Sequence, residues 1–81
     1  MDSKQMRDWM QQNLGKLATL RDEIRVDLHL AGMDAKDKWK DLEPKFRDAE
    51  RIAEEVSDAS RKAMEEMVER FRSFRESLRR Q

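Results

Sequence analysis

The sequence predicts an all-α protein, built as a long two-helix antiparallel hairpin resembling a coiled coil, and three observations support this. Apolar residues recur at steps of three and four along nearly the whole chain, as on one face of a helix. Charged residues make up 44% and hydrophobic residues 37% of the 81 positions, a balance typical of long helices. Two glycines, one proline and no tyrosine leave little turn or sheet material. We therefore expect one helical domain over residues 1–81.

The apolar stripe begins near Met6 and ends at Leu78. Each member follows the previous one by three or four residues, so the members share one helix face. Only Asn13 and Ser60 interrupt its apolar character. We expect self-association through the larger members of this stripe, which are Leu17, Leu20, Ile24, Leu28, Trp39, Leu42, Phe46, Val56, Met67, Phe71, Phe74 and Leu78.

The first helix is expected over about residues 3–42. Asp2 or Ser3 can cap its start by accepting a hydrogen bond from a backbone N–H. Within this helix, residues 23–30 alternate between apolar and polar, as in a half-buried strand. The helical phase accounts for far more of the chain than this short alternation does. We therefore interpret this stretch as helix.

The turn is expected near Glu43–Pro44, with the second helix over about residues 45–79. Proline lacks a backbone N–H and clashes with the preceding turn, so a helix interior disfavours it by ~3 kcal/mol. A turn at this point also leaves two arms of similar length. Gly32, followed by Asp34 as a cap, offers an alternative turn at residues 32–34. A kinked but continuous helix is a third alternative.

Two helices alone would leave the flanks of the stripe exposed to water. Small domains of this kind usually need oligomerisation to bury enough surface. We expect a homo-oligomer, and a dimer that forms a four-helix bundle is the simplest form. Apolar residues beside the stripe can supply the second contact, and these are Val26, Leu30, Met33, Ile52, Met64 and Val68.

No pattern in the sequence indicates a catalytic or metal site. His29 is the only histidine and cysteine is absent, whereas metal sites need several such ligands with defined geometry. The acidic residues between positions 54 and 69 lie beside the stripe and are expected to face solvent. We therefore expect no enzyme activity, no cofactor and no small-molecule substrate.

The C-terminal stretch 70–81 is rich in arginine, whereas the preceding residues 48–69 are mostly acidic among the charged positions. This order complements the dipole of the second helix. The same arginines suggest an alternative function, in which this end binds an anionic membrane surface or nucleic acid. Tryptophan is also favoured at interfaces. The candidate partner contacts are Trp9, Arg70, Arg72, Arg75, Arg79 and Arg80.

The function predicted from the sequence is that of a non-enzymatic, self-associating structural or protein–protein interaction module, with a protein partner in addition to its own copies. The net charge of zero does not steer the chain to a polyanion. The first residues lack the apolar segment of a secretory signal, and no stretch approaches the roughly 18 apolar residues of a membrane span. We expect a cytoplasmic location.

Overall fold

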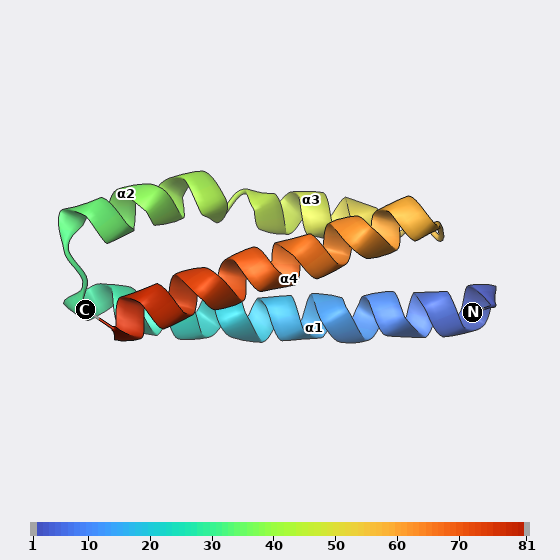
Figure 1. The fold of residues 1–81 in the computed structure, drawn as a ribbon, viewed down its shortest axis with the longest axis horizontal. Helices are drawn as coiled ribbons and strands as arrows, with labels where there is room; N and C mark the ends of the chain where they lie inside the picture. Colours follow the sequence, from blue (N-terminus) through green and yellow to red (C-terminus); the bar gives the residue numbers. More distant parts are fainter. Residues whose placement is uncertain (1, 81) are drawn as a thin grey trace.

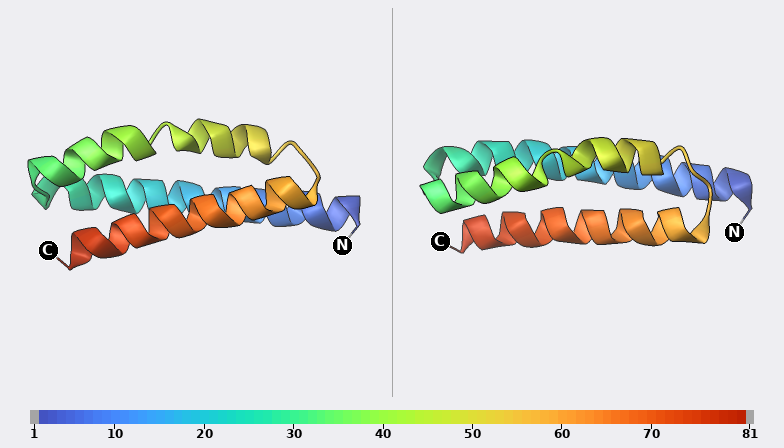
Figure 2. Two further views of the ribbon diagram at one scale, coloured as in Figure 1. Left: turned by 45° about the horizontal axis from the view of Figure 1, so that its top comes forward. Right: turned by 90° about the horizontal axis from the view of Figure 1, so that it is seen from above.

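Three helical arms lie side by side in the structure (Figure 1). This computed structural model describes residues 2–80 of the chain. The second arm consists of two shorter helices, and the third arm runs in the same direction as the first (Figure 2). The bundle measures 44 × 17 × 15 Å. Its elements are α1 (Ser3–Asp27), the short 3-10 helix η1 (Leu28–Leu30), α2 (Met33–Leu42), α3 (Lys45–Ile52) and α4 (Asp58–Arg79).

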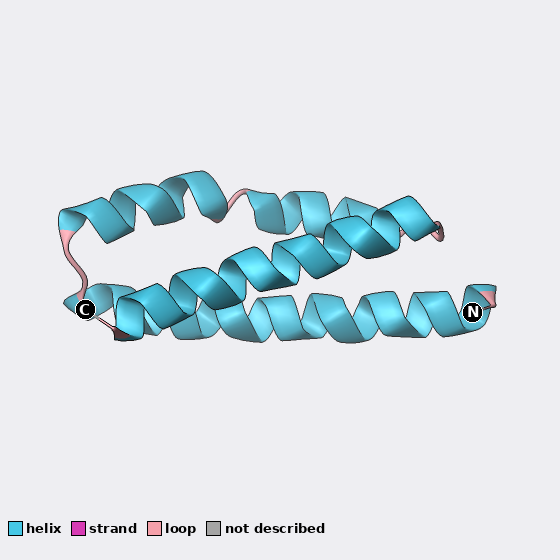
Figure 3. Ribbon diagram, viewed as in Figure 1, coloured by secondary structure: helices cyan, strands magenta, loops and turns pink. Residues whose placement is uncertain are grey.

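The all-α prediction is confirmed, because residues 2–80 form helices joined by turns and loops, without a strand. The alternating stretch 23–30 is helical too, since it lies in α1 and η1. The predicted two-helix hairpin differs from the structure, in which the chain reverses twice and forms three arms (Figure 3). The four-helix bundle made by two copies stays a prediction.

The first reversal lies at Ala31–Gly32 and overlaps the alternative turn at residues 32–34, but Gly32 is the N-cap of α2, and the expected cap, Asp34, lies in the first turn of that helix. After η1 ends, Ala31 and Gly32 adopt extended backbone, with ψ angles of 157° and 174°. Gly32 has a φ of −75°, which any residue can adopt, and open space surrounds it. The turn therefore follows from the extended backbone after the 3-10 helix, and it does not require the left-handed conformation that glycine favours.

The break at Glu43–Pro44 does not reverse the chain, which corrects the turn position expected there. Both residues keep right-handed helical dihedrals, and the N–H of Glu43 still donates to the carbonyl of Trp39 at 2.7 Å. The N–H of Arg47 donates to the carbonyl of Pro44 at 3.1 Å, so helical bonding resumes at once. Proline removes one donor but holds φ near its helical value. The result is an interruption between α2 and α3 within one arm (Figure 3).

The second reversal, at residues 53–57, contains neither glycine nor proline. Ser57 adopts an extended backbone with φ of −149° and caps α4. Its hydroxyl accepts from the N–H of Ser60, and the hydroxyl of Ser60 accepts from the N–H of Ser57, both at 3.1 Å. This capping box explains the polar stripe position, because Ser60 is only 4% exposed and its hydroxyl is satisfied.

The other polar stripe position, Asn13, is satisfied in a comparable way. Its side-chain amide donates to the carbonyl of Trp9 at 2.9 Å, one turn earlier on α1. The start of α1 also carries a capping box, in which the side chain of Asp2 accepts from the N–H of Gln5 at 2.8 Å. Neither Asn13 nor Ser60 therefore leaves a fully buried side-chain polar atom without a hydrogen-bond partner.

α1, α3 and α4 pack closely around the hydrophobic core, whereas α2 stands further off and contributes Ala35 and Trp39 to it. Trp39 fills the space between α2 and α4. Its ring lies edge-on to Phe71, with centroids 5.4 Å apart, and stacks on Phe74 at 5.8 Å. At 6% exposure the residue is buried, although it belongs to the least closely packed helix. The largest fully buried side chains are Met10, Leu17, Ile24, Met64 and Phe71.

Replacing the indole should strongly weaken the fold. Trp39→Ala is expected to lower the free energy of unfolding by about 3–5 kcal/mol, because α2 has few other contacts that could close the cavity. Urea unfolding followed by circular dichroism measures this change. Lys40→Ala, at the exposed neighbouring position, is the matched control and should change stability by less than about 0.5 kcal/mol. An effect of Trp39→Ala no larger than that of the control would contradict the role of the indole.

Candidate interaction surface

The stripe that the sequence marks for self-association forms the core of the single chain. Its members are buried or packed on buried residues, except for Val56, which is 37% exposed. One molecule covers the stripe by itself because the second reversal brings α4 back onto α1. The buried members are Leu17, Leu20, Ile24, Trp39, Met67, Phe71 and Leu78, and the half-buried ones are Leu28, Leu42, Phe46 and Phe74.

The apolar residues beside the stripe fall into two groups. Those on α4 and at the end of α3 pack in or against the core. Those around the first reversal are exposed, with Val26 at 67%, Leu30 at 97% and Met33 at 71%. We call these three residues the turn patch. The residues of the core group are Ile52, Met64 and Val68.

Local structure explains why the turn patch stays exposed. Val26 follows the buried residue Ile24 by two positions, which on an α-helix turns its side chain about 200° away from the core. Leu30 is the last residue of η1 and Met33 is the first residue of α2, so they flank the reversal. All three residues therefore lie in or beside the first reversal, at the end of the bundle where α1 leads through η1 into α2 (Figure 1).

The same end of the bundle holds a cluster of ion pairs between α1 and α4. The carboxylate of Glu23 accepts from Arg75 and from Arg79, each at 3.1 Å, and Asp27 accepts from Arg79 at 3.2 Å. The hydrogen bond to Asp27 is the main reason that the pKa of the Arg79 guanidinium lies above its ordinary value, with desolvation opposing it. These pairs attach the last turns of α4 to α1, close to the turn patch.

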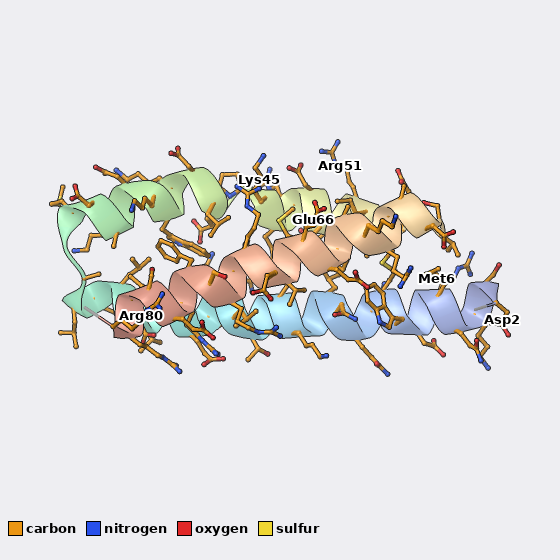
Figure 4. The ribbon with its side chains drawn as sticks, viewed as in Figure 1. Asp2, Met6, Lys45, Arg51, Glu66 and Arg80 are labelled. Atoms are coloured by element: carbon orange, nitrogen blue, oxygen red, sulfur yellow. The ribbon has the colours of Figure 1, made fainter. Side chains whose placement is uncertain are left out.

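The structure brings some of the candidate partner contacts together and separates others. Arg75 and Arg79 lie in the seam with α1, and Arg80 is exposed at the same end (Figure 4). Arg72 pairs with a glutamate one turn earlier on α4, at 3.3 Å. Trp9 lies near the opposite end, where it packs half-buried against the core. Several of the arginines are thus engaged in ion pairs with carboxylates of the chain itself.

Sequence reasoning treated these arginines as a basic end and missed their acidic partners. Glu23 and Asp27 stand four residues apart, as do Arg75 and Arg79, so each pair shares one helix face. This matching spacing was the available signal. It becomes meaningful only when α1 and α4 run in the same direction, which requires the second reversal.

A shallow, open hollow of about 770 Å³ lies between α2 and α4. It forms where α2 stands off from the bundle, and Leu42 and Phe74 supply its apolar lining. His29 is exposed on η1, and within residues 2–80 no three His, Cys, Asp or Glu side chains lie together so that they could hold a metal ion. The residues that line the hollow are Lys38, Asp41, Leu42, Glu66, Glu69, Arg70, Ser73 and Phe74.

Comparison with known proteins adds no relative, because no protein-family model, curated protein or solved structure matches the chain. Among the described helices, none is both long and apolar enough to cross a membrane. The function is therefore inferred from the surface of the molecule and its chemistry.

Removing the shared carboxylate should loosen the seam between α1 and α4. Glu23→Gln is expected to lower the free energy of unfolding by about 0.5–1 kcal/mol, because the partly buried guanidinium of Arg75 loses its charged acceptor. Asp22→Asn, at a more exposed neighbouring acid, is the control. Urea unfolding should be measured at low salt and at 1 M NaCl. The difference in the free energy of unfolding between the Glu23→Gln variant and the natural sequence should be smaller at high salt, because salt screens the charges. Equal effects of both substitutions would contradict the role of Glu23.

Proposed function

We propose that this chain is a non-enzymatic protein–protein interaction module that binds through the turn patch. The observation that supports this proposal most strongly is the 97% exposure of Leu30, with Val26 and Met33 exposed beside the same reversal. Apolar side chains that gather on a surface mark interaction sites, because burying each CH₂ group gains about 0.8 kcal/mol. The patch offers only carbon and sulfur atoms, so it can bind by excluding water but has no side-chain group that transfers a proton.

The other surfaces of the molecule support the same choice. The apolar stripe is already covered within one chain, so it offers little area to a partner. The hollow between α2 and α4 is bordered by five charged side chains, which a partner would have to desolvate or pair. Among the described residues, the remaining large apolar side chain with substantial exposure is Val56, at 37%. The turn patch therefore contains the three most exposed large apolar side chains among the described residues.

The turn patch is also held in place before it binds. Its α1 side is attached to α4 through Glu23 and Asp27, and Arg25 pairs with Glu43 at 2.7 Å on the other flank. Both ion-pair groups lie within four residues of Val26 along α1. A surface that is already ordered loses less conformational entropy on binding, which favours its use as a docking site.

Binding of an anionic membrane or nucleic acid by the arginine-rich end stays an alternative prediction, and the ion pairs give it less support. To bind phosphate groups, Arg75 and Arg79 would have to exchange Glu23 and Asp27 for them. Affinity for a polyanion grows with the number of cations that neutralise phosphates. With Arg72, which pairs with Glu69, three of the five arginines counted for this end therefore begin with acidic competitors.

A photo-reactive amino acid in place of Leu30 tests the proposed function in cells that produce the protein. Irradiation should give one discrete crosslinked protein species, because the patch is covered by its partner there. The same amino acid in place of Lys62, which is exposed on α4, is the control and should give none. Mass spectrometry of the excised band identifies what was bound. The proposed function would be overturned if no crosslinked species formed at position 30, or if the variants at positions 30 and 62 gave the same crosslinking pattern.

A further inference from the structure

We infer that α2 is a movable strap, which opens away from α4 while α1, α3 and α4 stay packed together. In the closed form Trp39 of this strap contacts Phe71 and Phe74 of α4. Opening exposes the indole and the faces of both phenylalanines that it covers. The movement therefore controls access to an apolar surface that is enclosed in the closed bundle. It does not require a partner at the turn patch, which is exposed in the closed form already.

A joint lies at each end of α2 (Figure 3). Before its first turn, Ala31 and Gly32 adopt extended backbone, and Gly32 caps the helix without a side-chain hydrogen bond. After its last turn comes Pro44, which has no N–H to continue the helical hydrogen bonding of α2. By contrast, α1 and α4 both begin with a capping box. Changes at a few dihedral angles in these joints can move α2 as a unit.

Few side chains attach α2 to the rest of the bundle. Of its ten residues only Ala35 and Trp39 are buried, and Leu42 packs half-buried against the core. An alanine side chain buries little surface, so the indole of Trp39 supplies most of the apolar contact that holds the strap closed. In contrast, α4 buries side chains along its length, from Ser60 to Leu78. A segment with few buried apolar contacts opens at a lower free energy than the whole chain unfolds.

The contact between α2 and α4 is also incompletely filled. The hollow of about 770 Å³ lies beside it, whereas the hollow lined by α1 and α4 measures about 290 Å³. Leu42 and Phe74 line the larger hollow and are only half-buried in the closed form. Because these side chains are partly exposed already, opening the strap exposes less new apolar surface than separating two fully packed helices would.

Ion pairs hold α4 more firmly than α2. Within residues 2–80, the charged side chains of α2 itself form no ion pair. The nearest pair joins Arg25 of α1 to Glu43, the residue that follows α2, and both side chains are exposed. Exposed pairs contribute little and are weakened by salt. Near the end of α4, by comparison, Arg75 and Arg79 share carboxylates of α1. The charges therefore leave α2 as the segment that can separate from the bundle most easily.

Hydrogen exchange of the natural sequence, followed by NMR, tests the strap without any substitution. The protection factors of the amides at residues 37–42 should be at least tenfold lower than those at residues 64–71 of α4. They should also be similar to one another, because one movement exposes them all. Low concentrations of urea should accelerate exchange in α4 more steeply than in α2, since unfolding of the whole chain exposes more surface.

Two results of the exchange experiment would overturn the strap. Equal protection and equal urea dependence in α2 and α4 would mean that α2 opens only when the whole chain unfolds. A gradual loss of protection toward the ends of α2, with full protection at its centre, would mean that the helix frays and does not move as a unit. Neither result would alter the expected crosslinking at Leu30, so the strap and the proposed function can fail separately.

Buried thiols provide a second measurement, because the natural chain contains no cysteine. The Ala35→Cys variant carries its thiol on the buried face of α2, and the Ala49→Cys variant is the matched control on α3, since both alanines are buried. Circular dichroism first confirms that each variant is folded. A thiol reagent should then label the Ala35→Cys variant at least tenfold faster than the control. Equal labelling rates would overturn the separate opening of α2.

Discussion

The α2 half of the middle arm depends on the indole of Trp39 for its place in the bundle, because α2 stands off from α1 and α4. The ring reaches across that space and contacts two aromatic residues of α4, Phe71 edge-on and Phe74 by stacking. The interruption at Glu43–Pro44 makes this necessary, since α3 packs on α1 and α4 whereas α2, beyond the kink, does not. The hollow between α2 and α4 follows from the same geometry. The position of the first reversal, which leads into α2, follows from this geometry as well.

Much of the core could be predicted from the sequence, whereas the path of the chain could not. Steps of three and four identify Leu17, Ile24 and Phe71 as core residues whether the arms number two or three, because burial depends on the face of each helix. The direction of the chain at a break depends on dihedral angles that residue type biases only weakly. Pro44 is compatible with helical φ, so it kinked the arm without reversing it. The decisive second reversal rests on a serine cap at Ser57, a signal that many solvent-exposed serines share.

The same limit applies to predicting the candidate interaction surface from the sequence. Val26, Leu30 and Met33 could be found in the sequence because they lie outside the phase of the stripe. Their exposure could not, since an apolar residue beside a stripe can equally pack against a third helix, as Met64 and Val68 do. The acidic partners of the arginine-rich end were missed for a related reason. Glu23 and Arg75 are 52 positions apart in the sequence, and only the parallel course of α1 and α4 brings them into contact.

The ion pairs between α1 and α4 and the turn patch lie at the same end of the bundle, and both depend on the parallel course of these two helices. Because α4 returns alongside α1, the arginines near its end meet the acids of α1, and part of the positive charge of this end is neutralised within the chain. The helical stripe is covered by the same packing, so neither a strongly basic surface nor an open apolar helix face results. What remains at this end is a small apolar surface on a backbone held by ion pairs on both flanks.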